Sequence, residues 1–580
     1  MAGGAERADV IFASLPRYLD VLALTISRCG YRVYYLGLSE SGQSAGAKRG
    51  RRAQALRLAG VCPLPLESLS RIEGFVKGLA DPGNLLDAKV RQLAPSRLLD
   101  AIGRLYPDNT DVARKLHVAL RSALSDGVVA VSRVNCWAQA HSGRRHVLIY
   151  PDVNGMLAFG LAANVRPFIL PLGVLIKGVA TTAGTLRRIW NSIIRATSNR
   201  SSSSVPSIAE PTVPPDASQP RAAFVVHDGL GYGNLYQKTL YYSDRTDSEL
   251  HSTNLLHFDY SGISGSFESL KWVCIGTGRD ALMAGRRYLF LAMRRGIFHI
   301  RNAHQMIGLL LLARIFAMFK TYSERMEPYP ALKVALIDYE ILCPMALLLA
   351  FDARSIKTLA AQERFIGSFY KANGGAILQT YLCGSEYASG LLQTSPAYRI
   401  DQCRAVGQHR SDQLVAARNA SPPRILQSPI AQGRKIITAL GFHTHKNWYE
   451  SECDPLLNWA AHRHFLEEII QLSIDLPNVF IVLRYKDVEW LSLPVFADVV
   501  RSIEASENLT ISLEYDKSFF SYDLCAHSDL VIAKHTSLGD ECLAVGIPVL
   551  FHDYTQNVTR IVADAFDYRP ARVMCFSYKE

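Results

Sequence analysis

The segment that most constrains the fold runs from Ser528 to Tyr554 and reads SDLVIAKHTSLGDECLAVGIPVLFHDY. Its two ends, Leu530 to Ala533 and Val549 to Phe551, are apolar and contain β-branched residues, as strands buried on both faces do. Between them lie a polar turn and a short helical stretch that Gly546 and Pro548 end. The segment therefore predicts a strand, a helix and a second, parallel strand, which is the repeating unit of doubly wound α/β sheets.

The polar turn of this segment has the composition of an anion site. Thr536, Ser537 and Gly539 lie where the helix begins, and Glu541 follows in its first turn. Backbone N–H groups at a helix start lack helical partners, and the helix dipole favours a negative charge there. We therefore predict a phosphate-binding turn, with Glu541 accepting hydrogen bonds from sugar hydroxyl groups. The alternative is that Ser537 caps the helix together with Asp540 and binds no ligand.

Three apolar runs upstream predict the rest of a C-terminal parallel sheet. They cover residues 435–442, 479–486 and 509–515 and are separated by helical patterns. His443 and Lys446 follow the first run, and Arg484 and Lys486 end the second. Because the carboxyl ends of such strands face the ligand crevice, we predict that these residues line the same mouth as Ser537. A solvated loop is the alternative interpretation.

The histidines of this region do not predict a metal centre. His443 and His445 are two residues apart, but no third ligand stands at a suitable spacing. We predict no metal site.

A second α/β unit is predicted to begin at residue 222. A strand at 222–228, which ends in His227 and Asp228, is followed by a loop with Gly229, Gly231 and Gly233. The glycine spacing is not that of a dinucleotide-binding motif. Further strands are predicted at 255–262, 272–276, 334–340, 356–364, 376–385 and 404–412.

The order of parts in the C-terminal segment resembles the nucleotide-donor half of the GT-B glycosyltransferases. The shared features are the small-residue anion turn, the acidic residue shortly after it and the GIPVL return to the sheet. The pattern is closest to CDP-glycerol glycerophosphotransferases and bacterial capsule or surface-polysaccharide transferases. The resemblance implies a nucleotide diphosphate at Thr536 and Ser537, neutralised by Lys446, Arg484 and Lys486, with the ribose held by Glu541. It implies no cofactor.

Three elements of the second unit also resemble an ordered series in that branch. They are Gln362-Glu363-Arg364, Cys383-Gly384-Ser385 and the run from Gly407 to Asp412. The first departs from the family, which has a His-Gly pair at this point. An acceptor hydroxyl needs a base during attack, and Glu363 is the substitute by position. The other candidates are His227, Asp228 and Glu340, and structural ion pairing is the alternative role for each.

The glycine loop after the first strand of this unit also has a counterpart in GT-B enzymes. There, such a loop lies where acceptor and donor phosphates come close to the backbone. The resemblance therefore implies an acceptor-side role for Gly229, Gly231 and Gly233, and a flexible strand-to-helix connection is the alternative.

The first 221 residues carry the basic excess of the chain. They contain 28 Lys and Arg against 15 Asp and Glu, whereas the remainder contains 35 against 37. Strand, helix and strand are predicted within residues 8–38, with further strands at 128–134 and 146–152. A basic face attracts anionic lipid or glycan. We find no nucleic-acid recognition motif and predict no nucleic-acid partner.

Residues 156–197 are apolar, but Arg166, Pro167, Pro171 and Lys177 interrupt them before a membrane span is reached. We predict one or two interfacial helices with Arg187, Arg188, Trp190 and Arg195 at the headgroup level, and a buried helix pair is the alternative. The shorter apolar segment at 306–320 is predicted to be a core helix.

The expected organisation has five parts. Residues 198–221 are rich in Ser and Pro and predict a linker. The ranges are 1–155 for a basic α/β region, 156–197 for the interfacial segment, 198–221 for the linker, 222–428 for the acceptor domain and 429–580 for the donor domain. The 11 scattered cysteines and the absence of a signal-peptide pattern at the N-terminus favour the cytoplasm.

We therefore predict an α/β chain with a GT-B-type pair of Rossmann-like domains and an additional N-terminal region. The expected function is metal-independent transfer of a sugar, or a polyol phosphate, from a nucleotide-activated donor to a glycan or lipid-linked acceptor at the inner face of the cell membrane. Two alternatives stay open. One is a nucleotide-sugar 2-epimerase of similar fold, which needs no membrane element. The other is a non-catalytic, transferase-like membrane tether.

Overall fold

The computed structural model of the 580-residue chain describes most of the sheets and helices and leaves several segments between them undescribed. The described residues are 8–13, 15–36, 38–39, 45–64, 82–106, 111–150, 161–169, 222–226, 255–259, 272–274, 278–337, 340, 343–362, 375–395, 397–408, 410–441, 459–485, 488–513, 520–533, 536–552 and 574–575.

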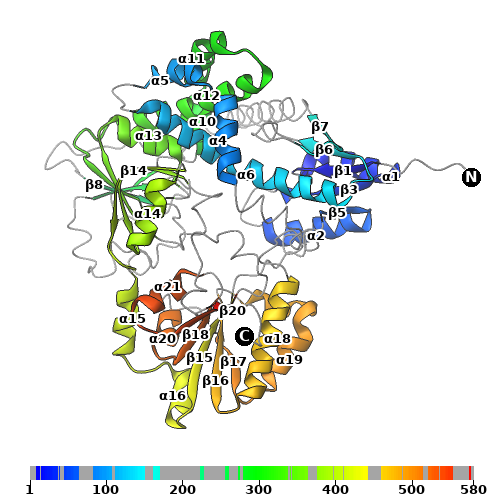
Figure 1. Ribbon diagram of the computed structural model, residues 1–580, viewed down its shortest axis with the longest axis vertical. Coiled ribbons are helices and arrows are strands. Elements are labelled where there is room, and N and C mark those ends of the chain that lie inside the picture. Colours follow the sequence, from blue (N-terminus) through cyan, green and yellow to red (C-terminus); the bar gives the residue numbers. More distant parts are fainter. Residues whose placement is uncertain are drawn as a thin grey trace, which may run out of the picture.

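The first sheet is built from the N-terminal region, and its strands are parallel (Figure 1). Its strands are β1 (Asp9–Phe12), β3 (Arg32–Tyr35), β5 (Val61–Pro63), β6 (His146–Tyr150) and β7 (Val165–Ile169), in the order β5-β3-β1-β6-β7. A small parallel pair, β2 (Leu15–Pro16) with β4 (Leu38–Ser39), stands beside it. The helices of this region are η1 (Arg17–Leu19), α1 (Asp20–Arg28), α2 (Ala45–Leu58), α4 (Pro82–Leu93), α5 (Ser96–Gly103) and α6 (Val112–Ala140).

The middle sheet has seven described strands, all parallel. They are β8 (Ala222–Val226), β9 (Leu255–Asp259), β10 (Trp272–Cys274), β11 (Val334–Ile337), β12 (Lys357–Ala361), β13 (Ala376–Cys383) and β14 (Tyr398–Ala405), in the order β10-β9-β8-β11-β12-β13-β14. The helices that follow in the chain are α10 (Gly278–Ala284), α11 (Arg286–Gly296), η4 (Ile297–His299), α12 (Ala303–Arg325), α13 (Met345–Ala353) and α14 (Glu386–Thr394).

The C-terminal sheet has six described strands, again parallel. They are β15 (Lys435–Leu440), β16 (Val479–Arg484), β17 (Leu509–Ile511), β18 (Leu530–Ala533), β19 (Val549–His552) and β20 (Met574–Cys575), in the order β17-β16-β15-β18-β19-β20. Its helices are α15 (Ser411–Arg418), α16 (Arg424–Ala431), α18 (Trp459–Asp475), η6 (Glu489–Ser492), η7 (Pro494–Phe496), α19 (Ala497–Glu504), α20 (Phe520–Ala526) and α21 (Ser537–Ala544).

All three sheets share one winding rule. When the strands of each sheet are counted in chain order, the first sheet reads 3-2-1-4-5, the middle sheet 3-2-1-4-5-6-7 and the C-terminal sheet 3-2-1-4-5-6. This is the order of Rossmann-type sheets, in which the winding direction reverses between strands one and four. The predicted fold class, an α/β chain with two Rossmann-like units and a further α/β region, is confirmed.

Helices α4, α5 and α6 share one apolar core with the middle sheet. Leu98 and Leu120 from these helices are buried in the same cluster as Leu309 and Phe351. The C-terminal half of α6 packs instead on the first sheet, where the Trp137 ring lies edge-on, 5.2 Å from that of Tyr34. The 29-residue helix α6 thus connects two sheets.

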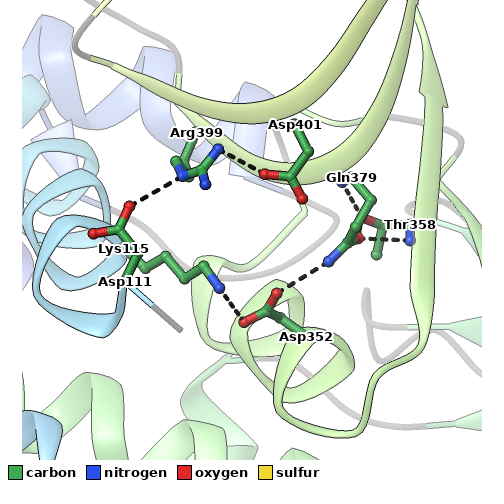
Figure 2. A network of polar contacts seen from close by, with 7 residues as sticks. All are labelled: Asp111, Lys115, Asp352, Thr358, Gln379, Arg399 and Asp401. Carbon is green, nitrogen blue, oxygen red and sulfur yellow. Dashed lines mark hydrogen bonds and ion pairs between the residues drawn. The ribbon is translucent and has the colours of Figure 1, made fainter. Parts of the chain in front are cut away.

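Polar contacts reinforce the attachment of α6 to the middle sheet (Figure 2). Lys115 Nζ lies 2.6 Å from Asp352 Oδ2, and Gln379 donates to the other oxygen of Asp352 at 3.0 Å. Gln379 in turn accepts a hydrogen bond from the backbone N–H of Thr358. A second set joins Asp111, just before α6, to Arg399 on β14, which also pairs with Asp401. Both sets connect residues more than 200 positions apart.

Helix α12 packs directly against α11. Among the described helices, one segment, His304–Arg325, is long and apolar enough to cross a membrane, but 61% of its most apolar window is buried. Leu309, Leu312 and Phe316 are buried against the neighbouring helices. The prediction of a core helix at 306–320 is confirmed.

Three local predictions are wrong. Residues 128–134 form part of α6 and not a strand, because Leu124, Val131 and Ala138 recur at helical spacing and are all buried. Residues 165–169, predicted to be interfacial helix, form the edge strand β7, where Pro167 is tolerated. The last strand of the middle sheet is 398–405, whereas 411–418 is the helix α15.

The five predicted ranges themselves stay a prediction. The described packing adds two facts about them. The core of the middle sheet includes the buried apolar residues Leu86, Leu98, Leu120 and Leu124. Leu414 and Ala417 of α15 are buried with residues of the C-terminal sheet. The chain therefore changes sheets between Ala405 and Ser411. The linker 198–221 and the remainder of 156–197 lie outside the described residues.

Candidate functional site

The C-terminal sheet reverses its winding between β15 and β18, and the candidate site lies at their carboxyl ends. Leu440 at the end of β15 pairs with both Arg484 on β16 and Ala533 on β18. Ligands of doubly wound sheets bind in the crevice outside this point of reversal. The start of α21 and the end of β16 therefore lie at the same edge of the sheet, and a shared ligand crevice there stays a prediction.

The turn after β18 leads directly into α21. Thr536 is the N-cap residue in extended conformation, and its side chain makes no capping hydrogen bond. Ser537 is the first helical residue, so the alternative in which Ser537 caps the helix is wrong. The Gly539 N–H donates to the Thr536 backbone oxygen at 3.0 Å, and the N–H groups of Ser537 and Leu538 before it lie where a helix offers no acceptor. The turn thus retains the donors that an anion requires.

Gly539 brings α21 close to the sheet. A Cβ atom at this position would lie 2.7 Å from the Phe551 ring and 3.4 Å from Ala533 Cβ. A side chain at this position fits only if the Phe551 ring or the helix shifts. The described role of Gly539 is therefore close packing, which sets the position of the helix start.

Glu541 is buried, and its carboxylate is held in place. Tyr522 on α20 donates a hydrogen bond to Glu541 Oε2 at 2.6 Å. Burial, followed by the charge of Glu541, raises the pKa of Tyr522 well above its usual value, and Arg410 acts in the opposite direction. Tyr522 is therefore a permanent donor, and Glu541, Tyr522 and Arg410 form one polar cluster beneath the turn.

The run from Gly407 to Asp412, which resembles a family element, meets this cluster. Ser411 Oγ donates to the backbone oxygen of Glu541 at 3.0 Å. Gly407 has a φ of +88°, a left-handed conformation that favours glycine and turns the chain toward the C-terminal sheet. The structure therefore brings Arg410 and Ser411 close to Glu541 and α21.

Arg484 lies at the predicted edge, but its guanidinium is buried and engaged. Its Nε donates to Ser521 Oγ at 2.9 Å, and its guanidinium carbon lies 5.3 Å from the centre of the Phe520 ring. In the described structure it fixes α20 to the sheet. Contact of Arg484 with a diphosphate stays a prediction.

The middle sheet has a corresponding polar edge. The three elements that resemble the family series follow the neighbouring strands β12, β13 and β14. Gln362 Oε1 accepts a hydrogen bond from the Gly384 N–H at 3.0 Å. A Cβ at Gly384 would lie 2.4 Å from the Gln408 side chain. Ser385 caps α14 by accepting from the Ala388 N–H.

Glu340 is a buried carboxylate just after β11. Tyr381 on β13 donates to Glu340 Oε1 at 2.7 Å. Burial and this carboxylate raise the pKa of Tyr381 well above its usual value. Glu340 was an alternative candidate for the base, and the structure gives it one tyrosine partner at the carboxyl edge of the middle sheet.

Two cysteines lie close together beside this edge. The sulfur atoms of Cys383 and Cys403 are 3.7 Å apart. The contact with Cys383 lowers the pKa of Cys403 to about 7, and the pKa of Cys383 is raised in turn. One of the two thiols is therefore readily ionised.

Several predicted site residues lie outside the described part of the chain. They are Glu363, His227, Asp228, Gly229, Gly231, Gly233, His443, Lys446 and Lys486. Their roles stay predictions. Within the described residues, no group of three or more His, Cys, Asp or Glu side chains is arranged to hold a metal ion.

Sequence reasoning gave no role to Tyr522 or Tyr381, and it included Arg410 only within the run from Gly407 to Asp412. The candidate residues were polar residues at the ends of predicted strands, whereas Tyr522 lies on a helix that precedes β18. A signal was present, because a tyrosine hydroxyl needs a hydrogen-bond partner when it is buried, and both tyrosines stand in elements whose other residues are mostly apolar.

The middle and C-terminal sheets thus form two Rossmann-order units joined in tandem. This pair is the architecture of a GT-B fold. The sequence resemblance and the observed strand order agree on it.

Comparisons with solved structures return proteins of this architecture at low similarity. UDP-GlcNAc 2-epimerase from Neisseria meningitidis, bound to UDP-GlcNAc, is 13% identical, with 59% of this chain and 85% of that chain covered and a TM-score of 0.33. A glycosyltransferase from Rickettsia africae is 11% identical, with 57% and 79% covered and a TM-score of 0.31. Trehalose 6-phosphate synthase from Burkholderia multivorans is 8% identical, with 60% and 88% covered and a TM-score of 0.30.

No protein-family model and no curated protein sequence matches the chain. Because the structural similarities have TM-scores below 0.5, no activity is inferred from them.

Proposed function

We propose that the protein transfers a sugar, or a polyol phosphate, from a nucleotide-activated donor to a glycan or lipid-linked acceptor. The observation that carries this proposal is the site at the winding reversal of the C-terminal sheet. There, the uncapped start of α21 is followed, four residues after Ser537, by the buried carboxylate of Glu541. A helix start suits a diphosphate, and a fixed carboxylate suits the hydroxyl groups of a ribose.

The chemistry divides between the two sheets. On the donor side, the N–H groups at Thr536 and Ser537, with Lys446, Arg484 and Lys486, neutralise the charge that develops on the departing diphosphate. No divalent ion is needed in this scheme. On the acceptor side, Glu363 takes the proton of the attacking hydroxyl, with His227, Asp228 and Glu340 as the other candidate bases. The loop of Gly229, Gly231 and Gly233 lies on the acceptor side in this proposal.

The proposed location is the inner face of the cell membrane, with the protein bound peripherally. The basic excess of the first 221 residues supports this location, because positive charge is attracted to anionic lipid headgroups. At this membrane face the protein would encounter a surface-glycan or lipid-linked acceptor.

The first test is nucleotide binding. A panel of nucleoside diphosphates and nucleotide sugars is screened by thermal shift, since a ligand that binds only the folded state raises its stability. Calorimetry then compares the intact protein with Ser537→Ala and Glu541→Ala. Each variant should lose about tenfold in affinity, because one hydrogen bond is removed. Arg501→Ala, an exposed position on α19, is the matched control and should bind normally.

The outcomes separate the alternatives. Unchanged nucleotide affinity in a folded Glu541→Ala variant removes the donor-site assignment. Formation of a 2-epimeric nucleotide sugar without an acceptor identifies an epimerase. A protein that binds membranes but no nucleotide is a non-catalytic tether. In a transferase, Glu363→Gln should lower turnover by about 10² to 10⁴ and leave donor binding intact.

A further inference from the structure

Helix α11 and the following turn η4 expose large apolar side chains on one outer face. Phe290 is 72% exposed and Phe298 is 87% exposed. Leu291, Met283 and Ile297 are exposed beside them. Single exposed apolar residues are ordinary on protein surfaces, but five within 16 consecutive positions form a patch that calls for a partner.

The outer face follows from helical spacing. Arg287, Phe290, Leu291, Arg294 and Phe298 recur three or four positions apart, which places them on one side. The opposite side carries Ala292 and Gly296, which are buried. The apolar outer residues are therefore additional to those that hold α11 in the fold.

The inner face of α11 is seated tightly on α12. A Cβ at Gly285 would lie 2.5 Å from the backbone oxygen of Ala317, and one at Gly296 would lie 2.2 Å from Leu309 Cδ1. The two helices approach closely because these positions are glycine. The apolar face is thus presented by a firmly packed element and is not a loose segment.

Arginine residues surround the exposed phenylalanines. Residues 281–323 contain six arginines, one lysine and no acidic residue. Arg287 pairs with Glu324 and stacks on Tyr288. Arg294 and Arg295 are exposed in the last turn of α11 and form no ion pair within the described part of the chain. The patch is therefore apolar in its centre and positive around it.

We propose that this α11–η4 face docks on the surface of a bilayer that contains anionic phospholipid. Exposed phenylalanines enter the boundary between headgroups and acyl chains, and guanidinium groups bind lipid phosphates. An anionic lipid surface matches both the apolar centre and the uncompensated positive charge. This inference deepens the proposed function. It rests on the proposal that the acceptor lies at the membrane, and it names the surface of the protein that contacts the bilayer.

The position of the patch sets the orientation of the molecule. Helix α11 lies at the end of the molecule opposite the C-terminal sheet (Figure 1). A protein docked through α11 therefore turns its candidate donor site away from the bilayer. A soluble nucleotide-linked donor then reaches α21 from the aqueous side.

The test is sedimentation of the intact protein with vesicles of phosphatidylcholine alone or with 30% phosphatidylglycerol. The double variant Phe290→Ser/Phe298→Ser should lose at least tenfold in binding to the anionic vesicles. Arg294→Gln/Arg295→Gln should lose roughly fivefold for each arginine at low salt, and less at high salt. The matched control is Ile474→Ser/Arg501→Gln, at exposed positions of the C-terminal region, which should bind like the intact protein.

Each outcome decides the proposal. Normal vesicle binding by a folded Phe290→Ser/Phe298→Ser variant overturns it. So does a change in oligomeric state by analytical ultracentrifugation, which would make the face a contact between copies. A nucleotide thermal shift in the same variant separates the two hypotheses. An intact protein that binds vesicles through this face but takes no nucleotide contradicts the proposed function and leaves the docking surface standing.

Discussion

The middle and C-terminal sheets are wound in the same order but are stabilised by different parts of the chain. Each places one buried carboxylate at its carboxyl edge under a tyrosine hydroxyl, Glu340 with Tyr381 and Glu541 with Tyr522. The middle sheet takes core residues from α4, α5 and α6, far earlier in the chain. Among the described residues, the apolar clusters around the C-terminal sheet draw their buried members from positions 414–551.

The difference teaches that strand order does not determine which segments a Rossmann-like unit needs in order to fold. The C-terminal sheet closes its core with local crossover helices. The middle sheet requires a layer of helices supplied by the N-terminal region, and it is fastened to them by ion pairs over long sequence distances. Loss of that layer should affect the two sheets unequally.

The largest effect is expected from Lys115→Met. Lys115 and Asp352 are 7% and 13% exposed, so the variant leaves a carboxylate largely buried without its cation. The free energy of unfolding should fall by about 3 kcal/mol. Urea denaturation followed by circular dichroism measures it.

The control for this comparison is Lys435→Met in the C-terminal sheet. Lys435 pairs with Asp529 at the surface, and both side chains are well exposed. The change should stay below about 1 kcal/mol. Equal losses of unfolding free energy in Lys115→Met and Lys435→Met would contradict the expectation that the two sheets depend unequally on these ion pairs.

The next effect concerns the close approach of α21 to the C-terminal sheet at Gly539. Gly539→Ala should lower stability by about 1 to 3 kcal/mol, because its Cβ meets the Phe551 ring. Gly390→Ala on α14 is the matched control. Its Cβ meets nothing within 4 Å, and alanine favours helix by about 1 kcal/mol. Thermal melts of the two variants should therefore shift in opposite directions.

A smaller effect, on nucleotide affinity, is expected to distinguish Tyr522 from Tyr381. Tyr522→Phe should weaken nucleotide binding by about threefold to tenfold, because Glu541 loses the donor that holds its carboxylate. Tyr381→Phe removes the equivalent bond from the middle sheet and should leave nucleotide affinity unchanged. Calorimetry on both variants tests whether the nucleotide binds beside Glu541. Weaker nucleotide binding in Tyr381→Phe would indicate that it binds at another place.

The smallest effect is chemical and concerns the cysteines. The pKa of Cys403 is about 7, so its thiolate fraction rises as the pH increases through 7. Alkylation by iodoacetamide should therefore be about tenfold slower at pH 6 than on the plateau above pH 8.

Two comparisons sharpen this prediction. Cys383→Ala should slow the reaction of Cys403 at pH 7, because the contact that stabilises the Cys403 thiolate is removed. Cys525 is buried in the C-terminal sheet region, and its pKa is raised well above the usual value by the neighbouring Cys542 thiol and by burial. Mass spectrometry that finds Cys525 alkylated before Cys403 would reverse the expected order.

The strands were the most predictable part of the fold. Runs such as 435–440 and 530–533 are apolar on both faces and admit few other structures. Residues 128–134 are rich in valine and were assigned to a strand. Packing of Leu124, Val131 and Ala138 along one side of α6 outweighs that local preference.

The candidate site was predictable where it follows a strand and unpredictable where it depends on packing between elements. The turn at Thr536 and the carboxylate of Glu541 follow β18 in sequence. Tyr522 reaches this carboxylate from α20, and Arg410, the residue before α15, interacts with Tyr522. Those meetings depend on how helices lie across the sheet, which residue periodicity does not specify.

The attachment of α6 to residues far along the chain also determines when this helix can pack during synthesis. Lys115 and Asp352 are separated by 237 positions. At a ribosomal rate of 5–20 residues per second, helices α4 to α6 wait roughly 10 to 50 s before their partners in the middle sheet emerge. During that interval their apolar faces are open to chaperones and to neighbouring nascent chains. We therefore expect production of this protein to depend on chaperone supply more strongly than production of its C-terminal sheet alone.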